Sequence, residues 1–195
     1  MIRIIAAVAL LALVLPAPVQ AQAPKAPAVP AAIADPQNTI LIDTKHGRIT
    51  IKLRPDLAPQ HVERIKLLTR EGFYDDVPFH RVISNFMAQT GDGQLKNGLG
   101  GSKYPNLRSE FTSTPFKRGI VGMGRTPDPN SANSQFFIVL GEASHLNNNY
   151  TVIGEVVSGM DVVDKIKKAP PNDRSGAVVD PDVMTKVTVA ADAPR

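Results

Sequence analysis

A permanent cation and several amide side chains stand among apolar residues in two short segments of this 195-residue chain. Arg81 and Gln89 are eight residues apart, with Phe86 and Met87 between them. The arginine guanidinium is always charged and holds its donors in a rigid fork, while a glutamine amide both donates and accepts hydrogen bonds. Together these residue types could hold a fixed cation beside an apolar pocket. The alternatives are an exposed, solvated arginine and apolar side chains that only fill the core.

A second segment, residues 133–138, places Gln135 directly before two phenylalanines. A lone amide in an apolar strand needs hydrogen-bonding partners, so Gln135 is a candidate for a polar site unless it points outward. This segment and residues 79–92 resemble the two signature segments of the cyclophilin family of peptidyl-prolyl cis-trans isomerases. The resemblance extends from about residue 39 to residue 166.

The resemblance implies a mainly β fold, a closed eight-stranded antiparallel β-barrel capped by two α-helices. It also implies catalysis of rotation about X–Pro peptide bonds. That rotation is slow because it disrupts amide resonance, and an enzyme accelerates it by binding the twisted amide better than either planar form. In the twisted state the prolyl nitrogen regains a lone pair, so a fixed cationic donor near it lowers the barrier while an apolar pocket holds the ring. No nucleophile, metal or cofactor is required.

Position by position, the resemblance implies that Arg81 is the catalytic cation and that Gln89 contacts the substrate. Proline-containing polypeptides are the expected partners. The other predicted substrate-binding residues form the walls of the proline pocket, a neighbouring groove, a loop that meets the peptide backbone, and the rim. The pocket walls are Phe86, Met87, Phe137 and Leu146, and the groove residues are Gly98 and Gln135. The loop residues are Gly124, Arg125 and Thr126, and the rim residues are His145 and Tyr150.

Three features depart from the family pattern. Gly124, Arg125 and Thr126 stand where Ala-Asn-Ala is usual. Contacts through the backbone tolerate such changes, so we expect little effect on catalysis. The new side chains are nevertheless expected to shift the substrate preference. His145 stands where many eukaryotic members have tryptophan, and Tyr150 where they have histidine. Because an imidazole offers less apolar surface than an indole, we expect weak binding of the macrocycle cyclosporin.

The first 21 residues have the pattern of a secretory signal peptide. Arg3 precedes an unbroken apolar run over residues 4–15, which is too short to span a bilayer at about 20 residues. We expect cleavage after Ala21 and export to the periplasm; the alternative is an uncleaved anchor. Residues 22–36 are mostly Ala and Pro, which favours an extended, flexible tether. Residues 37–195 form the predicted isomerase domain.

Composition sets further limits on the function. The chain has no cysteine, so neither disulfides nor thiol chemistry is available. Its net charge is only +4, and its basic residues are scattered, which argues against the basic stripe of a nucleic-acid-binding protein. The four histidines show no metal-ligand spacing, so no metal and no cofactor is expected. We expect a monomer that is not inserted in a membrane after signal cleavage.

Hydrophobic periodicity and turn residues predict the elements that must position the site. Residues 39–43 and 48–53 form a predicted hairpin. A helix is predicted to begin at Pro59 and to stop at Gly72. Either Leu67 or Leu68 completes its inward face. Further strands are predicted at 79–83, 87–90, 119–124, 136–140, 151–157 and 184–190, a second helix at 159–168, and a glycine-rich loop at 91–105.

Two other functions fit the same segments. A peptide-binding or chaperone module would keep the groove without turnover, and an exported structural or adhesive protein would reuse only the barrel. Neither needs both the cation at Arg81 and an apolar pocket, and this sequence retains both. The retained residues therefore favour an isomerase that acts on folding proteins of the cell envelope.

Overall fold

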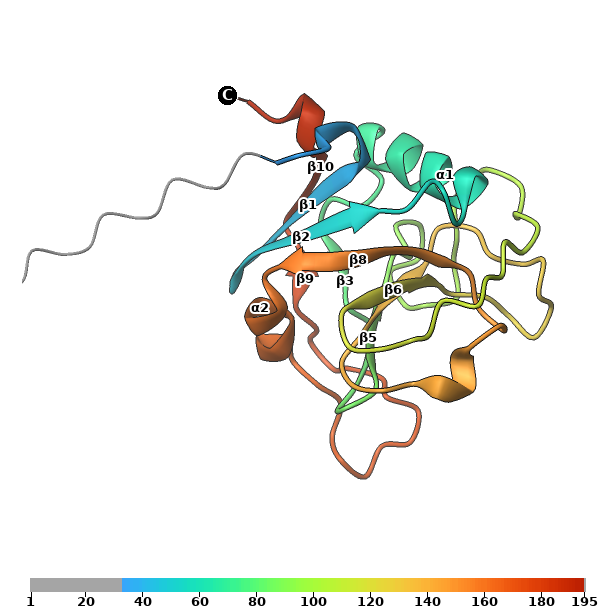
Figure 1. Cartoon of the computed structure of the whole chain (residues 1–195). Helices are drawn as coiled ribbons and strands as arrows, with labels where there is room; N and C mark the ends of the chain where they lie inside the picture. The colour runs from blue at the N-terminus through green and yellow to red at the C-terminus, as the bar shows by residue number, and fades with distance from the viewer. Residues whose placement is uncertain (1–32, 195) are drawn as a thin grey trace, which may run out of the picture. The chain divides into compact units, whose positions relative to one another are not determined.

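The computed structural model describes residues 33–194. The predicted signal peptide, residues 1–21, and most of the predicted tether, residues 22–36, therefore lie outside the described residues. The described part consists of a curved β-sheet with helices packed beside it (Figure 1). Within this part, no helix combines the length and the apolar character needed to cross a membrane.

Eight strands form one antiparallel sheet in the order β10-β1-β2-β8-β6-β7-β5-β4. Their bounds are Thr39–Thr44 (β1), Gly47–Leu53 (β2), Arg81–Ile83 (β4), Met87–Thr90 (β5), Ile120–Met123 (β6), Phe136–Val139 (β7), Val152–Ser158 (β8) and Lys186–Val189 (β10). Two short strands, Val77–Pro78 (β3) and Val183–Met184 (β9), pair separately. The predicted strand 79–83 is shortened to β4, and the predicted strand 184–190 is divided between β9 and β10.

The sheet is open and curled, so the predicted closed barrel is wrong. Closure would require β4 to pair with β10, the strand at the other end of the order. Instead, the segment formed by residues 169–178 takes up the free edge of β4. Val82 N donates to Gly176 O (2.9 Å), and Ala169 N donates to Val82 O (3.0 Å). This loop satisfies the polar groups that an unpaired edge strand would otherwise expose, so a ladder with β10 is not needed.

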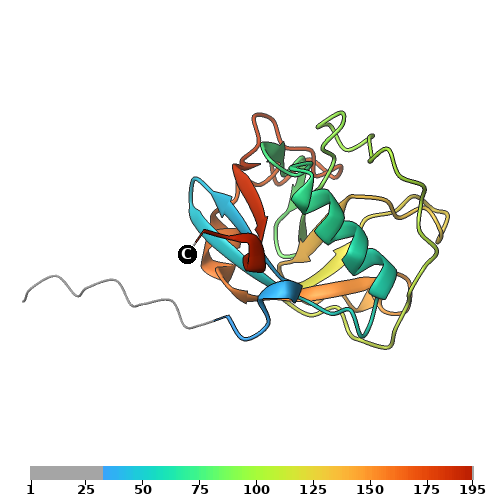
Figure 2. The ribbon, with the colours of Figure 1, turned by 90° about the horizontal axis from the view of Figure 1, so that it is seen from above.

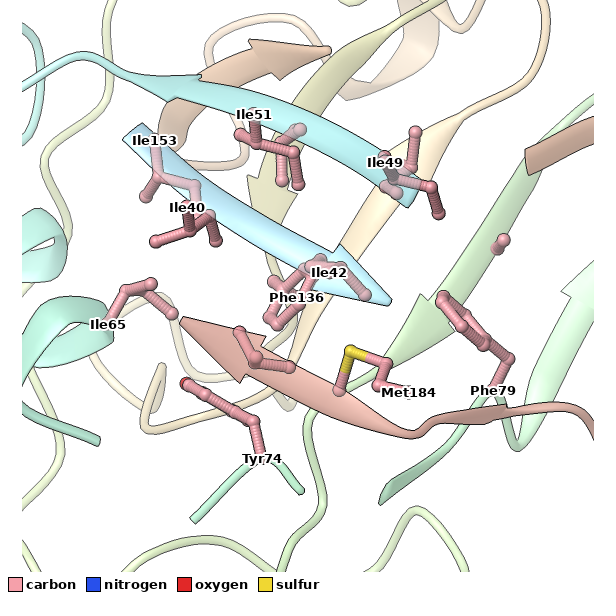
Figure 3. Packing of buried hydrophobic residues seen from close by; sticks show 14 of the residues in the cluster. Ile40, Ile42, Ile49, Ile51, Ile65, Tyr74, Phe79, Phe136, Ile153 and Met184 are labelled. Atoms are coloured by element: carbon pink, nitrogen blue, oxygen red, sulfur yellow. The ribbon is translucent and has the colours of Figure 1, made fainter. Parts of the chain in front are cut away.

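The main core lies between the strands and the longer helix. Ile49 and Ile51 of β2 are fully buried while their neighbours along the strand are exposed or half-buried, as expected for side chains that alternate across a strand. Figure 3 shows Ile40 and Ile42 of β1 gathered with these residues and with Phe136 of β7. This cluster fixes the register of the sheet, because a slip of one residue would expose it to water.

Helix α1 (Pro59–Arg70) packs against β10 (Figure 2). Proline is favoured at the first helical position because the N–H that it lacks would have no partner there. Of the two leucines that could complete the inward face, Leu68 is buried and Leu67 is exposed. The helix ends just before Gly72, as predicted.

Helix α2 (Met160–Lys165) packs against β2 and is shorter than the predicted range 159–168. The backbone leaves the helical region at Ile166, where ψ is 132°. The N–H of the next residue, Lys167, donates to the carboxylate of Asp182 (2.8 Å) in place of a helical carbonyl. A side chain from a distant part of the chain therefore stabilises the end of this helix.

Asp182 is buried and joins three segments of the fold. Its carboxylate lies 2.5 Å from Nζ of Lys45 and 3.0 Å from Nε2 of His46, in addition to the bond from Lys167. Burial alone would raise the pKa of this carboxyl, but these three partners lower the pKa to about 2. The folded state therefore holds the charged form more tightly than the unfolded chain does.

We predict that acid destabilises the protein partly through Asp182. Because the pKa is lower in the folded state, the stabilisation is fully present above about pH 4 and is lost as the pH falls toward 2. Asp182→Asn should lower the free energy of unfolding at neutral pH by about 2–3 kcal/mol and should flatten its decrease in acid. Denaturant unfolding at several pH values measures both effects, with the exposed Asp161→Asn as control. Identical acid profiles for wild type and Asp182→Asn would contradict the prediction.

Candidate active site

Two adjoining pockets collect twelve of the thirteen predicted site residues. The first is lined by Arg81, Phe86, Met87, Gln89, Gly124, Arg125, Phe137, Leu146 and Tyr150. The second is lined by Gln89, Gly98, Leu99, Gly100, Gly101, Ser102, Asn106, Gly124, Arg125, Thr126, Ser131, Asn133 and Gln135. With a volume of about 110 Å³, the first pocket is smaller than typical sites for drug-sized ligands, so it suits a single small side chain.

Strand register explains why the residues of the first pocket meet. β4 and β5 form a hairpin in which Arg81 lies opposite Gln89, and β5 pairs with β7 so that Gln89 lies opposite Phe137. Residues directly opposite on neighbouring strands point to the same face of the sheet. The spacing of eight residues between Arg81 and Gln89 is therefore the spacing of a hairpin pair.

Aromatic rings build the apolar wall of the first pocket. The ring of Phe137 stacks on Phe116, with 5.8 Å between centroids, and meets Tyr150 edge-on at 5.7 Å. A Cβ at Gly122 would lie 2.6 Å from Phe116 and 2.7 Å from Phe137, so only glycine leaves room for both rings. Phe137 is only 4% exposed, which makes this side chain part of the core as well as part of the pocket. Sequence reasoning did not single out Phe116.

Arg81 lies half-buried at the polar edge of the first pocket. Its Nε donates to Ser175 O (2.8 Å), and Nη1 donates to Oε1 of Gln89 (3.4 Å). Burial lowers the pKa of Arg81 from its ordinary value, although a guanidinium remains charged at neutral pH. Nη1 also lies 3.9 Å from Sδ of Met87. The cation is thus held in one orientation beside an apolar surface.

A directed chain of amide hydrogen bonds connects the two pockets. Nε2 of Gln89 donates to Oε1 of Gln135 (2.9 Å), and Nε2 of Gln135 donates to Gly98 O (2.9 Å) and Gly100 O (2.8 Å). The two carbonyls fix which way the amide of Gln135 points, and that amide fixes Gln89. Oε1 of Gln89 is therefore left to accept from Arg81. Gln135 points into the site, so the alternative of an outward-facing glutamine does not apply.

Asp92 holds the loop of the second pocket, and sequence reasoning missed it. Its carboxylate is fully buried and accepts hydrogen bonds from four backbone N–H groups, those of Leu95, Asn97, Gly98 and Gly100, at 2.8–3.1 Å. Burial alone would raise the pKa of Asp92, but these four bonds lower it below its ordinary value. An aspartate next to a glycine-rich loop was the available signal, since aspartate side chains often bond to the backbone of following turns.

His145 is the one predicted site residue that lines neither pocket. Its exposed imidazole lies against the ring of Phe86, with 5.1 Å between centroids. Tyr150, the other unusual rim residue, does line the first pocket. Among residues 33–194, no group of three or more His, Asp or Glu side chains is arranged to hold a metal ion.

We predict that Asp92→Asn loosens the loop of residues 93–101. The NH₂ group of asparagine cannot accept the backbone N–H bonds that a carboxylate oxygen of Asp92 now accepts. The bonds that remain would also be weaker, because hydrogen bonds to a charged group are stronger than those to a neutral one. The free energy of unfolding should fall by about 2–4 kcal/mol, and amide hydrogen exchange in this loop should accelerate.

The matched control for this variant is Asp128→Asn, because Asp128 is exposed and its carboxylate accepts from one backbone N–H, that of Asn130. Denaturant unfolding and hydrogen exchange should distinguish the two variants. Unchanged exchange of residues 93–101 in Asp92→Asn would rule out the assigned role.

Comparison with known proteins agrees with this geometry. Residues 39–189 match the family described as "Cyclophilin type peptidyl-prolyl cis-trans isomerase/CLD". A probable peptidyl-prolyl cis-trans isomerase of Brucella suis is 54% identical over 172 residues, covering 83% of this chain and 87% of the relative. Peptidyl-prolyl cis-trans isomerase B of Escherichia coli is 39% identical over 146 residues, covering 66% of this chain and 83% of the relative.

Solved structures of similar shape are also cyclophilins. A cyclophilin of Hirschia baltica superimposes with a TM-score of 0.73 at 26% identity, covering 82% of this chain and 76% of that one. A cyclophilin-type isomerase of Cryptosporidium parvum, crystallised in the presence of the dipeptide Ala-Pro, gives a TM-score of 0.70 at 25% identity and covers 77% of this chain and 98% of that one. The family match extends over most of the described residues, and the chain therefore belongs to the cyclophilin family of peptidyl-prolyl cis-trans isomerases.

Proposed function

We propose that this peptidyl-prolyl isomerase acts as a monomer on proteins that fold in the cell envelope, with Arg81 as its catalytic cation. The observation that carries the assignment of Arg81 is its setting, a permanent charge fixed by Gln89 and Ser175 at the edge of a small pocket with an apolar wall. Other chemistry at this site would need a nucleophile or a metal, whereas isomerisation needs only a group that favours the twisted amide.

In the proposed complex, the proline ring occupies the first pocket and contacts Phe137 and Met87. The guanidinium of Arg81 then lies near the prolyl nitrogen and donates to the lone pair that develops as the amide twists. Because the donor is already oriented and partly shielded from water, it stabilises this state without reorganising. The Ala-Pro dipeptide present with the Cryptosporidium parvum cyclophilin supports a short X–Pro segment as the ligand class. The second pocket would receive a neighbouring part of the peptide.

The proposed location in the cell envelope rests on the sequence of the first 21 residues. A single arginine, a short apolar run and Ala21 at the expected cleavage position form the pattern of an export signal. In the periplasm, unfolded proteins with non-native X–Pro isomers refold on the timescale of the uncatalysed rotation, so an isomerase there has abundant substrates.

We predict that Arg81→Ala lowers kcat/KM for a short X–Pro peptide by about 100-fold, the lower end of the loss seen when one preorganised donor to a transition state is removed. The melting temperature should change little, because the side chain is half-buried at a pocket edge. The control is Arg54→Ala, which removes a partly exposed arginine that is paired with Asp56 and lines neither pocket. A kcat/KM within twofold of wild type would exclude the role. Full peptide binding by a wild-type protein without turnover would instead indicate a binding module.

We predict that the chain is exported and cut after Ala21 when it is expressed in a Gram-negative bacterium. N-terminal sequencing of the protein released from the periplasm should begin at Gln22. Leu11→Arg interrupts the apolar run and should leave the uncleaved precursor in the cytoplasm, whereas Leu11→Ile should not impair export. Recovery of the wild-type chain from the cytoplasm with residues 1–21 intact would contradict the proposed location without affecting the assignment of Arg81.

A further inference from the structure

Arg125 occupies the boundary between the two pockets. Three residues line both pockets, Gln89, Gly124 and Arg125, and of these only Arg125 carries a charge. A peptide that places one side chain in the first pocket and another in the second crosses the boundary formed by these three residues, where Arg125 supplies the charge. A charge at such a position acts on the substrate near the reacting bond, whichever residues fill the pockets.

The guanidinium of Arg125 is fixed in place. Nε and Nη2 both donate to Asn149 O (3.1 and 2.8 Å), and Nη1 donates to Thr126 O (2.8 Å) and Pro127 O (3.2 Å). The group also lies 4.4 Å from the centre of the Tyr150 ring, a favourable cation–π distance. An arginine has five N–H donors, and within residues 33–194 four of those of Arg125 are engaged. The remaining one, on Nη2, has no hydrogen-bond acceptor within these residues.

The positive charge of Arg125 is not neutralised by a carboxylate within the described residues. Asp128, in the same loop, accepts from Asn130 N and forms no ion pair with Arg125. Arg81 in the first pocket likewise has no ion-pair partner in residues 33–194. Four arginines elsewhere do pair with carboxylates at 2.6–2.8 Å, namely Arg48 with Asp43, Arg54 with Asp56, Arg70 with Asp192 and Arg118 with Asp164. The substrate groove therefore carries two uncompensated cations.

We propose that Arg125 is a specificity-determining residue that favours X–Pro substrates with an acidic side chain next to the proline and disfavours those with a basic one. A carboxylate there would accept from the remaining N–H of Nη2 and gain from the charge of a group that is already oriented. A lysine at the same place would face two like charges. The inference rests on the proposed path of the peptide across both pockets.

The size of the effect follows from the exposure of the site. Ion pairs at a protein surface are weak, so we expect kcat/KM for a glutamate peptide to exceed that for the matched lysine peptide by about three- to tenfold at low ionic strength. The preference should shrink as salt is added, because the Debye length falls from about 30 Å at 0.01 M to about 3 Å at 1 M.

The test uses two peptide series, with Glu, Gln or Lys directly before the proline in one and directly after it in the other. A protease-free isomerisation assay is required, since a coupling protease has charge preferences of its own. Wild type should rank the peptides Glu, Gln, Lys in at least one series. Arg125→Gln should reduce the Glu-to-Lys ratio to less than half of the wild-type value, and Arg125→Lys should retain most of it. The ratio is informative even if these variants change turnover of all peptides alike.

The matched control is Arg48→Gln, which removes the same charge from a residue that lines neither pocket. Its Glu-to-Lys ratio should equal that of wild type. Equal kcat/KM values for the three peptides, a ratio that survives Arg125→Gln, or an equal loss in Arg48→Gln would each overturn the inference. No turnover of the neutral Gln peptide by wild type would count against the proposed function itself, so the two failures are distinguishable.

Discussion

The antiparallel register between β4 and β5 is the constraint on which the site depends. This register sets Arg81 opposite Gln89, and the register between β5 and β7 sets Gln89 opposite Phe137. Because side chains alternate across a strand, a slip of one residue would turn Arg81 toward the core, where Val82 is now fully buried, and would turn Val82 outward. A buried, unpaired guanidinium is far more costly than a misplaced apolar side chain, so the same residue that defines the site also excludes the wrong register.

The orientation of the cation is determined from a distance. The carboxylate of Asp92 holds the backbone of the second pocket, two carbonyls of that backbone orient Gln135, and Gln135 orients Gln89 beside Arg81. Each step is a hydrogen bond with only one workable direction, because each amide has its donor side and its acceptor side already assigned. The two pockets therefore form one connected polar framework around an apolar centre.

Features with a local cause could be predicted from the sequence, and features held by distant backbone atoms could not. Pro59 and the alternating residues of β2 specify a helix start and a strand through their own geometry. The pairing of β4 with residues 169–178, which leaves the sheet open, was missed because these residues have no strand periodicity and bond through main-chain atoms, which residue types do not reveal. The role of Asp92 was missed for the same reason. His145 was placed by resemblance alone, and its side chain turns to Phe86 instead of lining a pocket.

The bond from Arg81 to the loop of residues 169–178 ends on a main-chain atom, the carbonyl of Ser175. Any side chain at this position supplies that carbonyl, so alanine scanning of the loop would leave this support intact and undetected. Gly176 is the exception, because its φ is +75° and a Cβ there would lie 2.4 Å from Ile83. Diversity among natural variants of this segment should therefore be wide in side-chain chemistry and narrow in loop length and in the position of this glycine.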